Sequence, residues 1–153
     1  MRRLLSWRLL LLALVVAAFG LRVYRLDYQS LRGDESFSIQ FSAHELDWLF
    51  PNIANVELNP PLYYLLLHYW MASLGQSEFV TRFLSLVFGV VSVPLIYHLG
   101  RAMGNPRVGA LATFLLAINP FQVWHAQDVR NYTLWPALSM ASLGLLHLAL
   151  LSV

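Results

Sequence analysis

Residues 79–99, FVTRFLSLVFGVVSVPLIYHL, form an apolar run in which Arg82 is the only charged residue. A helix of about 20 apolar residues crosses the ~30 Å hydrocarbon core of a bilayer, so this run predicts a membrane-spanning helix. The whole chain agrees, because its 153 residues are 58% hydrophobic and only 12% charged, whereas soluble domains are about 25% charged.

Three further apolar runs are long enough to span a membrane: residues 4–21, 108–124 and 134–153. Arg2 and Arg3 precede the first of them, and the positive-inside rule therefore predicts a cytoplasmic N-terminus followed by an uncleaved first helix. The fold class that we expect is an all-α membrane protein with about four transmembrane helices.

The remaining apolar run, Pro61–Leu74, is shorter. As a helix it reaches about 21 Å at ~1.5 Å per residue, so we predict that it lies in the membrane interface or dips partway into the bilayer. Four crossings then place the loop of residues 22–78 and the residues 125–133 on the outer face, and they make residues 100–107 a short cytoplasmic turn. We expect one membrane unit over residues 1–153.

Composition also limits the chemistry. Cysteine is absent, which excludes disulfides, thiolate nucleophiles and Cys-ligated zinc. All ten cationic residues are arginine, and they are spread over several loops. Because they form no dense basic tract, nucleic acid is not an expected partner. Catalysis must use carboxylates, histidine, arginine or hydroxyl groups.

The first outer loop carries the most informative polar motif, Gly33-Asp34-Glu35-Ser36. A carboxylate beside apolar surface can take a proton from a hydroxyl nucleophile or hold a divalent metal ion. Asp34 and Glu35 are therefore candidate catalytic residues. The alternative interpretation is structural, with Asp34 as the N-cap of a helix and Glu35 as an acid of its first turn.

The residues that follow this motif fit two patterns. Phe37, Phe41 and Trp48 recur as on one face of a helix, whereas Phe37, Ile39 and Phe41 alternate as in a strand. We favour a short amphipathic helix on the membrane surface.

Two more motifs offer ligand-binding groups. Asn59 and Tyr63 flank a proline pair, where they either line a site at the membrane surface or belong to an interfacial belt. Asp128, Arg130 and Tyr132 lie on a polar island between two spans, and an arginine there can grip a phosphate group with two hydrogen bonds. The alternative is an Asp128–Arg130 pair in a solvated turn, with Tyr132 as an interface anchor.

His44 and His125 fall on the outer face of this topology. Together with Asp34, Glu35 and Asp128 they are candidate ligands of a divalent metal ion, although no pair has the ligand spacing of a known metal motif. A divalent metal ion is the one cofactor that the sequence leaves open.

Glu78 and Arg82 are four residues apart, the spacing of a helical ion pair. We interpret this pair as mainly structural, at the entrance of the span that begins there.

The motifs follow one another in a recognisable order. They are Leu31-Arg32-Gly33-Asp34-Glu35-Ser36, Asn59-Pro60-Pro61-Leu62-Tyr63-Tyr64, Asn119-Pro120 and Gln127-Asp128-Val129-Arg130-Asn131-Tyr132. This order resembles the N-terminal part of integral-membrane glycosyltransferases of the C-type fold. The resemblance is strongest to the bacterial branch with Rgt-type, aminoarabinose and protein O-mannosyl transferases.

The resemblance implies transfer of a sugar from a polyprenyl-phosphate-linked donor to an acceptor hydroxyl of a lipid, glycan or protein. It implies a site in the cell envelope, on the outer face of the bacterial cytoplasmic membrane, with Asp34 as the catalytic carboxylate and inversion of the anomeric centre. Such enzymes have about a dozen spans, so we expect this chain to be the N-terminal portion of a glycosyltransferase module. The competing hypothesis is a non-catalytic multi-span partner or assembly protein.

Overall fold

The computed structural model describes residues 2–55 and 59–152. All regular structure within these ranges is helical, and the predicted all-α class is confirmed. The helices are α1 (Arg2–Val23), α2 (Gly33–Ser42), α3 (Leu46–Asn55), α4 (Pro61–Leu74), α5 (Glu78–Met103), α6 (Pro106–Ile118), α7 (Pro120–His125) and α8 (Leu134–Leu151).

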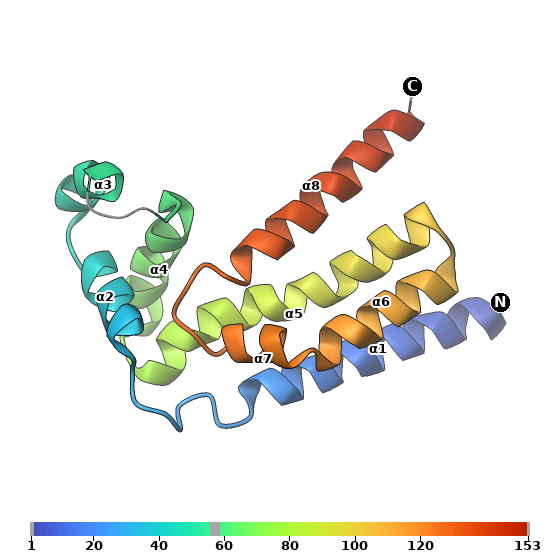
Figure 1. Ribbon diagram of the computed structural model, residues 1–153, viewed down its shortest axis with the longest axis horizontal. Coiled ribbons are helices and arrows are strands. Elements are labelled where there is room, and N and C mark those ends of the chain that lie inside the picture. The colour runs from blue at the N-terminus through green and yellow to red at the C-terminus, as the bar shows by residue number, and fades with distance from the viewer. Residues whose placement is uncertain (1, 56–58, 153) are drawn as a thin grey trace.

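Helices α1, α5 and α6 pack along one another and form the body of the molecule, and α8 lies against α5 (Figure 1). Helices α2, α3 and α4 gather at one end, where α4 contacts both α2 and α5. The segment between α7 and α8 reaches the same end, whereas the turn between α5 and α6 lies at the opposite end (Figure 1). Two loops that are distant in sequence, residues 24–32 and 126–133, are thereby brought together.

Among the described residues, α5 and α8 are long and apolar enough to cross a membrane. Helix α5 has 26 residues and contains the predicted run 79–99, and α8 has 18 residues and begins at the first residue of the predicted run 134–153. Helix α1 has 22 residues and extends the predicted run 4–21 at both ends. Helix α4 has the bounds of the short run Pro61–Leu74.

The predicted run 108–124 is not one continuous helix, because it breaks at Asn119. Proline has no N–H to donate to the carbonyl four residues earlier, and its ring clashes inside a helix, so Pro120 begins a new helix. The Asn119 side chain caps that helix by accepting hydrogen bonds from the amides of Phe121 (2.9 Å) and Gln122 (3.2 Å). The same two residues, Asn119 and Pro120, thus end α6 and start α7.

Arg22, near the end of α1, stabilises this break. The last carbonyls of α6 lose their helical partners where α7 begins. The fully buried Arg22 guanidinium donates to the carbonyls of Leu116 (3.2 Å) and Ala117 (3.0 Å). A buried cation therefore supplies hydrogen bonds to the last carbonyls of α6 and holds the end of that helix against α1.

The turn between α5 and α6 uses the residues that the sequence offers for it. Gly104 follows the last residue of α5, and Pro106 is the first residue of α6. The Asn105 side chain caps α6 by accepting hydrogen bonds from the amides of Arg107 (2.9 Å) and Val108 (3.2 Å). This short turn sets α6 antiparallel to α5.

Gly109 lets α6 pack directly on the backbone of α5. A β-carbon at this position would lie 2.6 Å from the carbonyl oxygen of Tyr97 and 3.1 Å from the amide nitrogen of Arg101. We expect Gly109→Ala to lower the free energy of unfolding in detergent micelles by about 1–3 kcal/mol, the usual cost of overpacking. Gly144→Ala is the matched control, since nothing lies within 4 Å of a β-carbon there. Equal stability of the two variants would contradict the close contact.

The loop after α1 folds into helices, as predicted, and the strand alternative is wrong. Phe37 and Phe41 are four residues apart on α2, and their rings stack with centroids 5.4 Å apart. Phe41 is buried together with Leu49 and Ile53 of α3 and Tyr64 of α4. The aromatic side chains thus join α2, α3 and α4 into one small unit.

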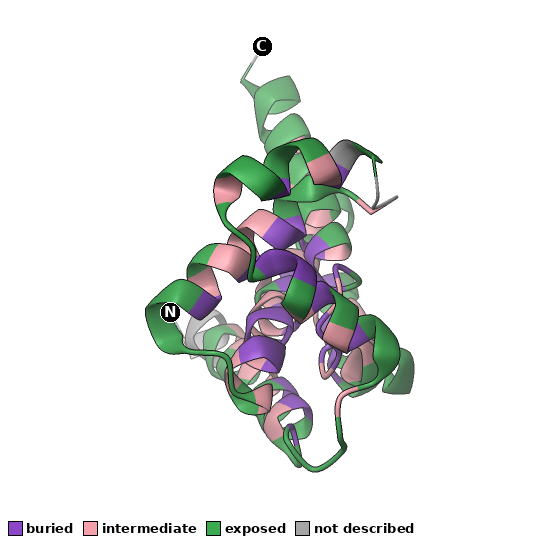
Figure 2. Ribbon diagram, turned by 90° about the vertical axis from the view of Figure 1, so that its left-hand side faces the viewer, coloured by how far each residue is buried: buried purple, intermediate pink, exposed green. Residues whose placement is uncertain are grey.

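Burial is concentrated where the elements meet (Figure 2). One apolar cluster joins α4, α5, the segment before α8 and the first residue of α8, and it contains Tyr63, Leu67, Met71, Leu84, Val129 and Leu134. By contrast, the C-terminal part of α8 is mostly exposed (Figure 2). The packed end of the molecule is therefore the end that carries α2 and the loop after α7.

Candidate functional site

A buried ion pair between Arg82 and Glu35 joins α5 to α2. Arg82 Nε lies 2.9 Å from Glu35 Oε1, and Arg82 Nη2 lies 3.0 Å from Glu35 Oε2. Glu35 is fully buried and Arg82 is 3% exposed. Two charges that leave water need further hydrogen bonds to offset their lost hydration, and both side chains have them.

Glu35 also accepts hydrogen bonds from the backbone amides of Arg32 (3.0 Å) and Val129 (3.2 Å). Burial raises the pKa of the Glu35 carboxyl, but the hydrogen bonds from Arg82 and these amides, with the charge of Arg82, outweigh burial and hold the pKa below its ordinary value. Glu35 therefore stays ionised and ties the loop after α7 to α2 and α5.

Arg82 also organises the loop that follows α1. Its Nη1 donates to the carbonyls of Leu26 (3.0 Å) and Gln29 (2.7 Å), and its Nη2 donates to that of Ser30 (3.4 Å). The predicted contact with Glu78 exists at 3.9 Å, but the Glu78 side chain is 42% exposed. The local helical pair is thus the weaker of the two ion pairs of Arg82.

Asp34 is not the N-cap that the structural alternative predicts. Helix α2 begins at Gly33, so Arg32 occupies the cap position, and Glu35 closes the first turn by accepting from the Arg32 amide. Asp34 lies within that first turn, and its side chain is 52% exposed. Its carboxylate is accessible to a ligand, whereas that of Glu35 is not.

Arg130 approaches Asp34 from the loop after α7. Arg130 Nε lies 3.9 Å from Asp34 Oδ2, and Arg130 Nη1 donates to Ser38 Oγ at 3.3 Å. The Nε atom is buried and has no hydrogen-bond partner among the described residues. Burial by itself lowers the pKa of Arg130, but Tyr64, Tyr132 and Asp34 reverse this effect and raise it above the ordinary value. An accessible carboxylate and a fixed cation therefore face each other.

Asp128 does not form the predicted alternative pair with Arg130. Its carboxylate contacts the Arg32 guanidinium, and it lies 3.3 Å from His125 Nδ1. The Arg130 amide donates to the Asp128 carbonyl at 2.8 Å, a backbone contact only. The solvated Asp128–Arg130 turn is wrong because both carboxylate oxygens of Asp128 have other partners.

Tyr63 of α4 supports the loop that carries Arg130 through a hydrogen bond to Ser85 of α5. Its hydroxyl lies 2.7 Å from Ser85 Oγ, which in turn donates to the carbonyl of Arg130 at 3.1 Å. Thr133 Oγ1 donates to the carbonyl of Ser85 at 2.7 Å. Burial raises the pKa of the Tyr63 hydroxyl above its ordinary value. These contacts hold the Arg130 backbone against α5.

Tyr132 and Asn59 occupy different places. Tyr132 is 43% exposed, and its ring lies 4.5 Å from that of His125 and 6.0 Å from the Arg130 guanidinium carbon. Asn59 is half-buried and stands just before the proline pair that starts α4. Of the residues singled out from the sequence, Arg130 thus lies near both Asp34 and Tyr132.

Within the described residues, no group of three or more His, Cys, Asp or Glu side chains is placed to hold a metal ion. His44 stacks on Trp48 with ring centroids 3.8 Å apart. Glu35 and Asp128 are engaged by arginines. The five-residue metal site that the sequence leaves open is therefore not assembled in this part of the chain.

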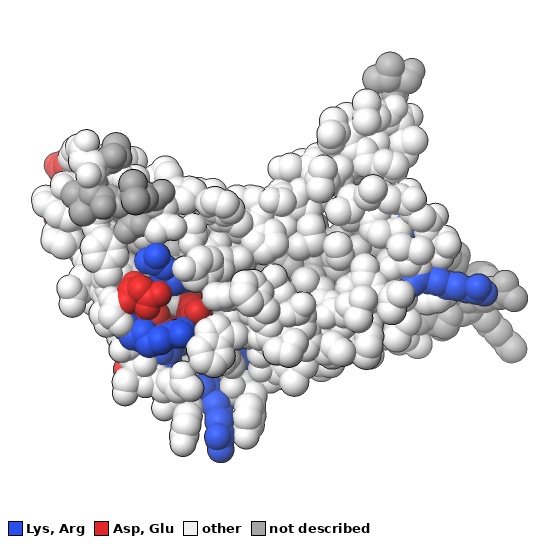
Figure 3. All heavy atoms as spheres, viewed as in Figure 1, with Lys and Arg blue, Asp and Glu red and all other residues white. Residues whose placement is uncertain are grey.

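Charged side chains gather in a patch near the N-terminal end of α2 (Figure 3). A cavity of about 420 Å³ opens at this patch, and its wall includes Arg32, Arg82, Trp124 and Asp128. The cavity therefore adjoins the network built by Glu35 and Arg82.

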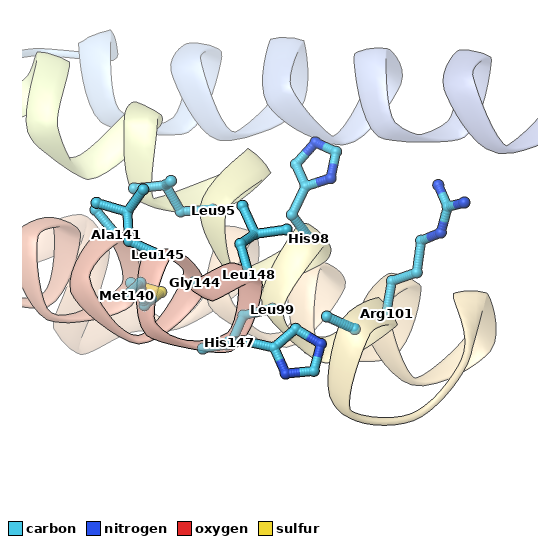
Figure 4. A pocket seen from close by; sticks show the side chains of 11 residues that line it. Leu95, His98, Leu99, Arg101, Met140, Ala141, Gly144, Leu145, His147 and Leu148 are labelled. Atoms are coloured by element: carbon cyan, nitrogen blue, oxygen red, sulfur yellow. The ribbon is translucent and has the colours of Figure 1, made fainter. Parts of the chain in front are cut away.

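A larger cavity of about 580 Å³ lies between α5 and α8, away from this patch. Its wall is apolar except for His98, Arg101 and His147. Figure 4 shows the two histidine rings directed to different sides of the cavity. Because this cavity has no carboxylate in its wall and its histidines do not converge, we place the candidate site at the other end of α5.

Sequence reasoning missed Arg32 and Ser38, which contact Asp128 and Arg130. Both lie in or beside the motif that contains Asp34, and this closeness in sequence to the acidic pair could have marked them as candidate site residues. Their partners come from the loop after α7, and spacing along the chain does not indicate such contacts.

Comparison with known proteins identifies the family of the chain. A family model described as dolichyl-phosphate-mannose-protein mannosyltransferase matches residues 58–151. The comparison finds no matching curated protein and no matching solved structure. The matched segment includes Arg82, Asp128 and Arg130, and Asp34 precedes it. Because the match covers more than half of the chain, the chain belongs to the dolichyl-phosphate-mannose-protein mannosyltransferase family, a family of lipid-phosphate-sugar-dependent glycosyltransferases.

Proposed function

We propose that the chain is the N-terminal part of a glycosyltransferase module that moves a sugar from a polyprenyl-phosphate-linked donor to an acceptor hydroxyl. The acceptor is a lipid, a glycan or a protein. The observation that carries this proposal is the pair of Asp34 and Arg130, a half-exposed carboxylate 3.9 Å from a guanidinium that is 14% exposed.

Asp34 is the general base in this proposal. The acceptor oxygen forms a bond to the anomeric carbon while the bond from that carbon to the phosphate oxygen breaks. Asp34 takes the hydroxyl proton, and polyprenyl phosphate leaves with the electrons of the broken bond. A base must be within reach of the proton that it removes, and the exposure of Asp34 supports that role. Attack opposite the leaving group inverts the anomeric centre.

Arg130 grips the phosphate of the donor. A guanidinium offers a planar set of donors that matches phosphate oxygens, and the Arg130 Nε has no hydrogen-bond partner among the described residues. The Ser85 hydroxyl fixes the backbone of Arg130 by donating to its carbonyl, and the Ser38 hydroxyl fixes its side chain by accepting from the guanidinium. Glu35 acts as a positioning residue in this proposal, because its oxygens are already engaged by Arg82 and by backbone amides.

The site belongs at the outer surface of the bacterial cytoplasmic membrane in this proposal. Four spans, α1, α5, α6 with α7, and α8, belong to this proposal, and the meeting of the loops 24–32 and 126–133 at one end supports it (Figure 1). Exposed aromatic residues at that end, Trp124 (52%) and Trp135 (54%) among them, fit the belt found at membrane–water interfaces. Residues 1–153 act as one membrane unit in this arrangement.

Donor binding tests the role of Arg130. Hydrogen bonds to charged groups contribute about 1.5–3 kcal/mol, so we expect Arg130→Ala to raise the Kd for a polyprenyl-phosphate sugar by about 10–150-fold. Arg130→Lys should restore part of the affinity, because a point charge lacks the planar fork. The measurement is a titration of the purified chain in detergent micelles with the donor.

Arg107→Ala is the matched control, since Arg107 is exposed in the first turn of α6. Its Kd should equal that of the unmodified chain. If Arg130→Ala keeps full donor affinity, Arg130 has only a structural role in its loop and the proposed grip is refuted.

A further inference from the structure

Arg25 has an unfavourable backbone conformation. Among the described residues it is the one non-glycine residue with a positive φ, +56°. It lies just after the end of α1, where the Leu26 amide donates to the carbonyl of Val23 at 3.2 Å. Glycine is the residue that most often takes this left-handed position after a helix, because a β-carbon makes the conformation costly. Strain of this kind often marks a functional position.

Two exposed tyrosines hold the Arg25 side chain. Its guanidinium carbon lies 4.7 Å from the ring centroid of Tyr28 and 5.4 Å from that of Tyr24. Tyr28 is 70% exposed and Tyr24 is 65% exposed. No acidic side chain of residues 2–55 or 59–152 forms an ion pair with Arg25 in the structure. The guanidinium is therefore oriented by cation–π contacts while its N–H groups stay available to an anion.

Arg25, Tyr24 and Tyr28 form part of the wall of the 420 Å³ cavity described above. Gln127 fixes this part of the wall, because its Nε2 donates to the carbonyls of Arg22 (3.0 Å) and Tyr24 (2.9 Å). The cavity thus combines a fixed cation with aromatic rings at its rim.

The inner wall connects the cavity to the candidate site. The Arg32 guanidinium carbon lies 5.2 Å from the ring centroid of Trp124, and the same guanidinium contacts Asp128. The Arg32 backbone amide in turn donates to Glu35. The side chain of Arg32 therefore lies in the cavity wall, while its backbone contacts Glu35 of the candidate site.

We propose that this cavity binds a ligand that carries a phosphate group next to a sugar ring. Arg25 holds the phosphate, and the Trp124 ring packs against the sugar. A planar guanidinium matches phosphate geometry, and an aromatic face gives an apolar surface for a ring. This inference goes beyond the proposed glycosyl transfer, in which Arg130 holds the phosphate of the donor at a separate place.

The test is binding of glucose 1-phosphate to the purified chain in detergent micelles, with methyl glucoside as the uncharged comparison. We expect saturable binding of glucose 1-phosphate and binding of methyl glucoside at least about tenfold weaker. Arg25→Gln and Arg25→Gly should each weaken glucose 1-phosphate binding by at least about tenfold. Arg25→Gly should unfold at the same or a higher temperature, because glycine accepts the positive φ. Arg107→Gln is the control for loss of one exposed arginine.

A second arm distinguishes a soluble ligand from a lipid headgroup. Phosphatidylglycerol micelles that displace glucose 1-phosphate from the unmodified chain would assign the cavity to a lipid-linked phosphate, and failure to displace it would assign the cavity to a water-soluble one. Both results support a phosphate site. Equal binding by the unmodified chain and by Arg25→Gly, or no saturable binding at all, refutes it.

The result is independent of the proposed transferase mechanism. Asp34→Asn should still bind glucose 1-phosphate, because Asp34 is not in the cavity wall. Suppose that Asp34→Asn still transfers sugar while Arg25→Gly no longer binds glucose 1-phosphate. The role of Asp34 as general base is then refuted, and the phosphate site in the cavity is supported.

Discussion

Asp34→Asn should reduce sugar transfer by about 10²–10⁴-fold, the usual contribution of a positioned general base. Asparagine is nearly isosteric with aspartate but cannot accept the acceptor proton. Asp34 lies in the first turn of α2 with its side chain 52% exposed, so a lost charge there should lower the stability of the chain by no more than about 0.3–1 kcal/mol. The variant should therefore lose most of its activity while it keeps most of its stability.

The measurement is sugar transfer by the complete transferase that carries this segment, with thermal unfolding as the second readout. Asp47→Asn is the matched control, because Asp47 is likewise an exposed acid in the first turn of a helix, α3, in the same loop. It should transfer sugar at the normal rate. Near-normal transfer by Asp34→Asn would remove Asp34 from the mechanism and leave Glu35 and Asp128 as the remaining carboxylates.

The gathering of Asp34 and Arg130 was predictable from span lengths. If Pro61–Leu74 does not cross the membrane, the loops 22–78 and 125–133 are predicted to share a face, and the polar motifs on that face then suggest a site. This inference needs only helix length and the thickness of a bilayer.

The partner of Glu35 was not predictable in this way. Arg82 lies 47 residues away, while Glu78 stands four residues from Arg82 at the spacing that favours a helical pair. Local spacing therefore points to the weaker contact, and only the fold, in which α4 packs on both α2 and α5, reveals the stronger one. The break at Asn119 was also missed, because the apolar run continues through it and hides the effect of Pro120.

Arg82→Met should be the most destabilising single substitution in this network, with a loss of about 3–5 kcal/mol in the free energy of unfolding. That is the usual cost of removing one partner of a buried ion pair. The fully buried Glu35 carboxylate would lose both of its side-chain hydrogen bonds. The carbonyls of Leu26 and Gln29 would lose their donor as well, so the loop after α1 should become more mobile.

The pH dependence gives this prediction a second readout. In the unmodified chain the pKa of Glu35 is depressed, so its contribution to stability is fully present above the unfolded pKa of about 4.3 and is lost as the pH falls through the folded value. In Arg82→Met burial is no longer opposed by the guanidinium, and Glu35 takes up a proton at higher pH. The difference in stability between the two proteins should therefore be largest at neutral pH and narrow toward about pH 4.

Denaturant titration in detergent micelles measures this difference. Glu78→Gln is the matched control, since Glu78 lies 3.9 Å from Arg82 with its side chain 42% exposed, and exposed pairs contribute no more than about 1 kcal/mol. A large loss in Arg82→Met beside a small one in Glu78→Gln would assign the stability to the long-range pair. Equal losses would mean that the helical pair, and not the contact with Glu35, holds α5 to the loop.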